Sequence, residues 1–178
     1  MTDAPDRPSP RFPESRVPQV RLRVQTVLEQ QAQPLHGVSS AARGGDLIFL
    51  TALLELGGTA TVLLPFPPDD FRGTSVGEGW DEIFDRVLRN PQVEVRPPIH
   101  PTLPASTDAQ IQAFEACNDW IVNELAALST TYQDPEPLFL SVFHQTAAQL
   151  AGGTWDAINR WRDSGHPVTI IDPLAPDA

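Results

Sequence analysis

The sequence predicts an α/β protein, a three-layer Rossmann-like sandwich with a mostly parallel sheet. Two observations favour this fold class. Helical patterns and short apolar runs alternate along the chain, which is the order of elements in an α/β fold. The apolar runs, of which TATVLLP at 59–65 is the clearest, do not alternate with polar residues, so both faces of each strand should be covered, as in a parallel sheet. The length of 178 residues fits one domain spanning residues 1–178.

The helices are predicted from apolar spacing and from residues that begin or end a helix. Pro18 suits the first turn of one helix, and Ser106 suits the N-cap of another. Gly44–Asp46 opens a helix that the glycine pair 57–58 ends. The other expected helices cover residues 18–32, 81–89, 107–129 and 154–163.

The strands are predicted from β-branched and apolar runs. They cover residues 34–38, 59–65, 93–96, 138–143 and 168–171. Proline-rich stretches form the rest of the chain: an extended arm at 1–16, a loop at 97–104 and a tail at 173–178. The segment PFPPDDFRGTSVGEGW at 65–80 is predicted to be a loop that is too long for a simple connection, so a functional role is expected.

The composition narrows the possible partners. A formal net charge of -11 argues against a non-specific nucleic-acid binder or a protein that binds anionic membranes, because both need a basic face. Cys117 is the single cysteine, which excludes an intramolecular disulfide and a cysteine-based zinc site. No run of about 18 apolar residues occurs, and the N-terminus does not resemble a signal peptide. A cytoplasmic location is therefore expected.

Small polar residues and glycines follow three of the predicted strands. These segments are SSAARGGD, PFPPDDFRGTSVG and HQTAAQLAGGT. Ligands of parallel sheets bind beyond the carboxyl ends of the strands, where these segments should gather. Two of them carry a glycine pair before a helix, whose N-terminal N–H groups favour an anion. Neither matches a Walker loop or GxGxxG, and each pair alone is also compatible with a simple tight turn.

A phosphate-bearing ligand is expected at this edge. The arm can fold over the ligand and supply arginines, or it can be a solvated tail. The expected ligand-binding residues are Arg7, Arg11, Gly37, Ser39, Ser40, Arg43, Gly44, Gly45, Pro65, Thr74, Ser75, Asn118, Gly152, Gly153 and Thr154.

Candidates for acid–base chemistry are few. The four histidines show no metal-ligand spacing and no evident carboxylate partner, so a structural role is expected for each. His144 is the exception, because it follows a strand at the binding edge. Trp155 can stack on a base but is better explained by core packing, as is Trp161. No nucleophile elbow is present.

The segment at 37–67, GVSSAARGGDLIFLTALLELGGTATVLLPFP, resembles the glycine-loop, helix and strand unit of the SLOG superfamily, named after Smf/DprA and LOG proteins. AGGTWDAINRWRDSGHPVTIID at 151–172 resembles its later Gly-Gly-Thr turn, helix and strand. DAPDRPSPRFP, LPFPPDDFRGTSV and ACNDWIVNELAAL are similar to a bacterial group with TRAFs-binding-like or tetratricopeptide-associated domains. The resemblance implies a Rossmann-like domain that binds a nucleotide-derived ligand at its glycine loops.

Two departures from the family pattern matter. LOG enzymes carry a glutamate three residues after the threonine of their Gly-Thr motif, where this chain has Ala157. Asp156 lies one residue early and should point about 100° away on the helix, which puts catalysis of the LOG type in doubt. The family's arm also follows an apolar strand, whereas this chain begins at the arm. The sheet is therefore expected to lack its first, central strand, unless an upstream start, a rebuilt sheet or a partner chain supplies it.

Three functions follow from these patterns. The main hypothesis is a sensor or regulatory module that binds a nucleotide-like small molecule and acts through an effector protein or a homo-oligomer. The second is a nucleotide hydrolase or phosphoribohydrolase, with Asp156 or His144 as acid or base. The third is a degenerate domain that serves as an interaction surface. No metal site is expected, and Mg²⁺ would enter only with the phosphates of a nucleotide.

Overall fold

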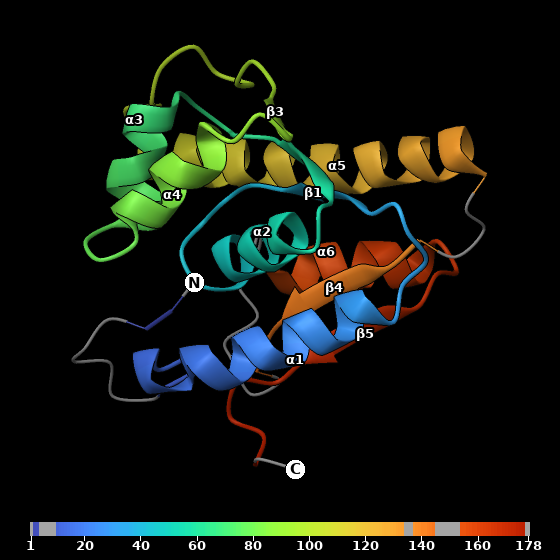
Figure 1. Cartoon of the computed structure of the whole chain (residues 1–178). Coiled ribbons are helices and arrows are strands. Elements are labelled where there is room, and N and C mark those ends of the chain that lie inside the picture. The colour runs from blue at the N-terminus through green and yellow to red at the C-terminus, as the bar shows by residue number, and fades with distance from the viewer. Residues whose placement is uncertain (1, 4–9, 134–136, 145–153, 177–178) are drawn as a thin grey trace.

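The computed structural model describes residues 2–3, 10–133, 137–144 and 154–176. Helices and parallel strands alternate along the chain, which confirms the α/β class (Figure 1). The α-helices are α1 (Val17–Glu29), α2 (Gly45–Glu55), α3 (Pro68–Phe71), α4 (Asp81–Leu88), α5 (Thr107–Tyr132) and α6 (Thr154–Asp163). A short 3₁₀ helix covers Glu14–Arg16, and a π-helix, η2, covers Arg72–Val76. The strands are β1 (His36–Ser39), β2 (Thr59–Val62), β3 (Val93–Val95), β4 (Phe139–Val142) and β5 (Val168–Ile171).

The strands form two parallel sheets rather than one. The first has the order β1-β2-β3, with Val38 opposite Thr61, and the second joins β4 to β5, with Ser141 opposite Ile170. Strand pairing does not join the two sheets within the described residues. The sequence predicts one sheet, and the structure instead has two.

The two sheets meet beside the N-terminus of α2. A Cβ atom built on Gly45 would lie 3.1 Å from the Cβ of Val142, the last residue of β4. The carboxyl end of β4 therefore lies next to the loop that follows the carboxyl end of β1. The carboxyl ends of β1 and β4 therefore lie on the same side of the molecule, at the start of α2.

The hydrophobic core is concentrated around α2 and β2. Leu47, Leu50 and Leu53 of α2 are almost fully buried, as is every residue from Ala60 to Phe66. This core extends to α1, α4 and Phe12. A cluster this large can supply most of the favourable burial free energy of the fold.

The second sheet lies between two clusters. Ile171 packs into the large core, whereas Val168 and Ile170 pack with Phe143 and Ile158 in a small cluster beside α6. Since neighbouring residues of a strand point to opposite faces, α6 covers one face of this sheet and the main core covers the other. Several residues of β4 and β5 nevertheless stay partly exposed, so the expected full coverage of every strand is not reached.

The structure corrects two expectations about loops. The segment 65–80 contains α3 and η2, because Pro68 pre-forms the first turn of a helix and two aspartates favour its N-terminus. The described end of the arm is extended only in part, because the chain bends at Arg11 and Phe12 and forms a 3₁₀ turn at Glu14–Arg16. The cap of α5 is confirmed: the hydroxyl of Ser106 accepts the N–H of Ala109 at 3.2 Å.

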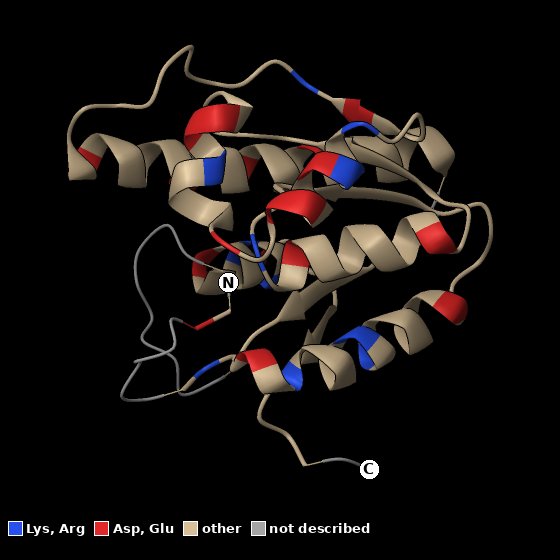
Figure 2. Ribbon diagram, turned by 60° about the vertical axis from the view of Figure 1, so that its left-hand side comes forward, with Lys and Arg blue, Asp and Glu red and all other residues tan. Residues whose placement is uncertain are grey.

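Charged residues of both signs are spread over the helices, with basic and acidic positions interspersed in Figure 2. No helix among the described residues is long and apolar enough to cross a membrane.

Candidate functional site

The loop between β1 and α2 is tied together by the side chain of Asp46. Its Oδ2 atom accepts the hydroxyl of Ser40 at 2.5 Å and the N–H of Ala42 at 3.1 Å. Ala41 and Gly44 have positive φ angles of 65° and 85°, so the chain turns sharply before α2. The loop is fixed in shape before any ligand arrives.

The first turn of α2 retains unused hydrogen-bond donors. The first backbone bonds of the helix run from Leu47 to the carbonyl of Ala42 and from Ile48 to that of Gly44. Within the described part of the chain, the N–H groups of Gly44, Gly45 and Asp46 have no acceptor. Such N–H groups at the start of a helix form a ready binding site for an anion.

Arg43 connects this loop to η2. Its backbone N–H donates to the carbonyl of Ser75 at 3.0 Å, and its Nη1 atom lies 3.4 Å from where a Cβ on Gly77 would be. Its Nε atom is buried and has no hydrogen-bond partner among the described residues. A buried guanidinium N–H without an acceptor is costly, and a bound anion would satisfy it.

Residues of the second loop have more structural roles than the sequence suggested. The exposed Thr74 makes its hydroxyl contacts within its own turn, to the carbonyls of Asp70 and Phe71. Ser75 is 4% exposed and Pro65 is buried, with its carbonyl accepting the N–H of His100. The described contacts of these residues are therefore structural.

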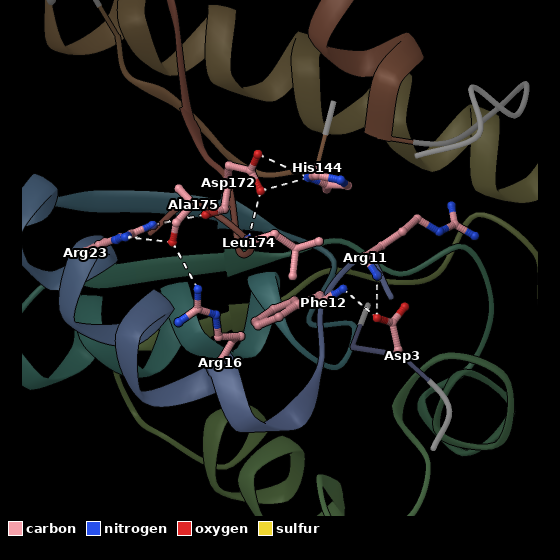
Figure 3. Close-up of polar contacts among 9 residues, drawn as sticks. All are labelled: Asp3, Arg11, Phe12, Arg16, Arg23, His144, Asp172, Leu174 and Ala175. Carbon is pink, nitrogen blue, oxygen red and sulfur yellow. Dashed lines mark hydrogen bonds and ion pairs between the residues drawn. The ribbon is translucent and has the colours of Figure 1, made fainter. Parts of the chain in front are cut away.

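His144 and Asp172 form a pair at the ends of β4 and β5 (Figure 3). The Nδ1 atom of His144 lies 3.0 and 3.1 Å from the two carboxylate oxygens of Asp172. Oδ1 of Asp172 also accepts the N–H of Leu174 at 2.8 Å. The expectation that no histidine has a carboxylate partner is therefore wrong. Asp172 was missed because only strand pairing reveals that the two residues are neighbours, although each lies within two residues of the end of a strand.

The described part of the arm folds back beside this pair. The Oδ2 atom of Asp3 accepts the N–H groups of Arg11 and Phe12, each at 2.6 Å (Figure 3). Thr2 is 3% exposed. The guanidinium of Arg11 makes no hydrogen bond or ion pair with any residue that the structure describes. An arginine in this position can pair with an anionic ligand.

The remaining expected residues are placed as follows. Arg7, Gly152 and Gly153 lie outside the described residues. Thr154 is exposed at the first position of α6, and Ser39 is buried at the end of β1. Asn118 is half-buried in α5. Gly37 has a packing role, since a Cβ there would lie 2.6 Å from the side chains of Leu53 and Phe49.

The candidates for LOG-type catalysis are not supported by position. Ala157, at the position where LOG enzymes carry a glutamate, is 8% exposed and faces the interior, and Asp156 is the half-buried residue before it. Trp155 stacks on Phe143 with ring centroids 5.5 Å apart, and Trp161 is 1% exposed. Trp161 therefore packs in the interior, and Trp155 packs partly buried against the small cluster.

Cys117 and His36 also have shifted pKa values, and burial in the fold is the main cause of both shifts. Burial raises the pKa of Cys117 to about 12, with a smaller contribution from the charge of Asp46, and its thiol donates to the carbonyl of Leu63. Burial also lowers the pKa of His36, whose ring nitrogens contact the hydroxyls of Thr59 and Thr61. A thiol with so high a pKa is not a nucleophile at neutral pH.

Other surface features give less support for a ligand site than the carboxyl edge does. Charged surface hollows open to solvent lie along α4, lined by Glu82, Asp85, Arg86, Arg89 and Asn90, and none of these residues belongs to the carboxyl edge. Within the described ranges, no three histidine, cysteine or acidic side chains gather as metal ligands would.

Comparison with protein-family models, with curated proteins and with solved structures finds no match to this chain.

Proposed function

We propose that this protein binds the phosphate of a nucleotide or nucleotide-derived ligand at the N-terminus of α2 and acts as a sensor or regulatory module. The observation that carries the proposal is the set of donors there. The N–H groups of Gly44, Gly45 and Asp46 and the buried Nε of Arg43 have no acceptor among the described residues. Three N–H groups at one helix start, preceded by an arginine whose guanidinium lies beside Gly77, suit the several oxygens of a phosphate.

One charge opposes this proposal. The carboxylate of Asp46 belongs to the same helix turn and would repel an anion. Its Oδ2 atom is held by Ser40 and Ala42, on the loop before the helix. These hydrogen bonds offset part of its charge, and the cation of Arg43 and the helix dipole act in the favourable direction.

The two other functions have less support at this site. A phosphoribohydrolase of the LOG type needs a carboxylate where Ala157 is buried. A degenerate domain acting only as an interaction surface has no need for unused donors at α2. Since nucleotides are intracellular ligands, the proposal also favours a cytoplasmic location.

Binding is tested by thermal unfolding with a series of nucleoside mono-, di- and triphosphates, with and without Mg²⁺. A ligand present at a hundredfold excess over its Kd stabilises the fold by about 2.7 kcal/mol. We expect Arg43→Gln to weaken binding by about tenfold or more, because a charge-assisted hydrogen bond contributes about 1.5–3 kcal/mol. Arg89→Gln is the matched control, since its side chain is 78% exposed just after the end of α4.

Comparing the two variants shows whether a loss of nucleotide binding is specific to the proposed site. Equal loss of binding in Arg43→Gln and Arg89→Gln would indicate a general effect of charge and would remove the assignment to α2. If no nucleotide stabilises the unaltered protein, the glycines serve only as turns, and the interaction-surface hypothesis takes precedence.

A further inference from the structure

We infer that two copies of this protein pair along the open edge of β3, so that the first sheet continues across a two-fold axis. The surface is the outer edge of residues 93–97, and the partner is a second copy of the chain. β3 is the last strand in the order β1-β2-β3. The inference is independent of the proposed nucleotide site, to which no residue of β3 contributes.

The outer edge of β3 has unused backbone groups. On the inner side, the carbonyl of Gln92 accepts the N–H of Ala60. The N–H of Arg96 donates to the carbonyl of Val62 on the same side. Alternate residues of a parallel strand direct their backbone groups to opposite sides, so Val95 directs its N–H and C=O away from β2. Among the residues that the structure describes, no strand pairs with this side, and β3 lies at the outer margin of the molecule in Figure 1.

An antiparallel pair centred on Val95 satisfies both of these groups at once. The two copies of Val95 lie directly opposite each other and exchange N–H···O=C hydrogen bonds in both directions. A two-fold axis passes between them, as an isologous contact requires. Pro97 has no N–H, and the N–H of Val93 already donates to the carbonyl of Asn90, so the ladder ends after this residue pair. So small a contact predicts a weak dimer that forms only at high concentration.

The side chains beside Val95 carry opposite charges in a self-complementary order. With Val95 at the axis, Glu94 of each copy lies opposite Arg96 of the other. The Cβ atoms of directly opposite residues are about 4.5–5.5 Å apart, which is close enough for an ion pair. The side chains of Glu94 and Arg96 are 62% and 42% exposed, so both can reach the second copy. The axis therefore forms two Glu–Arg pairs and places no like charges opposite each other.

Arg96 is incompletely paired within its own chain. Its Nε atom lies 3.1 Å from Oε1 of Glu94, yet this N–H makes no hydrogen bond with any described residue. Its Nη2 atom lies 3.5 Å from Oε1 of Glu124 on α5, at the limit of a hydrogen bond. Both contacts are long or poorly aligned, so the guanidinium keeps donors for a carboxylate of the second copy.

The other face of β3 is apolar. Val93, Val95 and Pro97 alternate with the charged residues and therefore share this face. Val95 is 36% exposed, and it is one of the few large apolar side chains that remain exposed among the described residues. In the dimer the two copies of Val95 contact each other, and Val93 lies opposite Pro97. Apolar groups meet apolar groups on this face, which removes further apolar area from water.

Two features act against pairing. A formal net charge of -11 on each copy causes long-range repulsion. At about 0.15 M salt the Debye length is about 8 Å, so this repulsion is screened more than the attraction between side chains in contact. A short edge strand followed by proline is also a common protection against pairing. Such protection commonly uses lysine, which repels a second copy, whereas β3 carries one charge of each sign.

The test measures the mass of the full chain by sedimentation between about 10 µM and about 1 mM, at about 0.15 M salt. We expect a monomer–dimer equilibrium in this range. Glu94→Arg and Arg96→Glu each place like charges opposite each other twice, so each should weaken the dimer by about tenfold or more. Arg162→Glu is the matched control, because it makes the same change of charge at an exposed position of α6.

A mixture of the two single variants separates pairing from damage to the fold. Glu94→Arg has two cations in the row and Arg96→Glu has two anions, so the mixture should form a heterodimer at concentrations where each variant alone is monomeric. The amide of Val95 should also exchange with solvent more slowly as the unaltered protein is concentrated. A monomer at every concentration, equal weakening by Arg162→Glu, or no heterodimer in the mixture would overturn the inference. The first of these results would leave the edge of β3 to an extended segment of another protein.

Discussion

The two sheets of the molecule differ in how deeply they are buried in the hydrophobic core. The sheet β1-β2-β3 is built into the large core, and the segment Ala60–Phe66 is buried throughout. The sheet β4-β5 has partly exposed strands and a small separate cluster of Phe143 and Ile158 on its outer side. The proposed site lies where the two sheets meet. This arrangement gives a rigid helix start on one side of the ligand and a less stable element on the other, as is common at binding sites.

The largest difference between the two regions is expected from phenylalanine truncation. Phe66 is fully buried, and its ring packs against Phe71 and Phe114. Phe66→Ala should therefore lower the free energy of unfolding by about 3–5 kcal/mol, measured by urea denaturation. Phe143 is 9% exposed and lies in the small cluster, so Phe143→Ala should lower the free energy of unfolding by a smaller amount. Equal costs would show that the two regions are equally well packed and would break the comparison.

A smaller effect is expected from glycine substitution. In Gly37→Ala the new Cβ would lie 2.6 Å from the side chains of Leu53 and Phe49, inside the large core. We expect a loss of about 1–3 kcal/mol in the free energy of unfolding, from overpacking. Gly73→Ala is the control, because a Cβ there meets nothing within 4 Å. If Gly37→Ala left the free energy of unfolding unchanged, the packing around β1 would be able to relax. That outcome would contradict the view that the first sheet is rigid.

Local patterns were sufficient to predict most of the elements. The helix at 154–163 and the strand at 168–171 have the expected bounds, and Ser106 caps α5 as its side chain suggests. The helix within 65–80 was missed although Pro68 and two following aspartates are helix-start signals. Its single turn and the π-helix after it are too short to show an apolar period.

The candidate site was predicted only in part. The loop 39–45 could be located from the sequence, because glycines before a buried helix follow a strand. The pair of His144 with Asp172 could not, since its two residues are 28 positions apart and only the pairing of β4 with β5 brings them together. The division of the sheet is also a matter of tertiary pairing, which no local pattern encodes.

The most direct test of the account is an amide NMR titration of the ¹⁵N-labelled protein with the nucleotide that stabilises it most. We predict the largest shifts at the N–H groups of Gly44, Gly45 and Asp46, because they would donate to the phosphate, with smaller shifts at Thr154. Shifts confined to the hollows along α4, or no saturable shift at these three amides, would contradict the assignment of the ligand site to the start of α2.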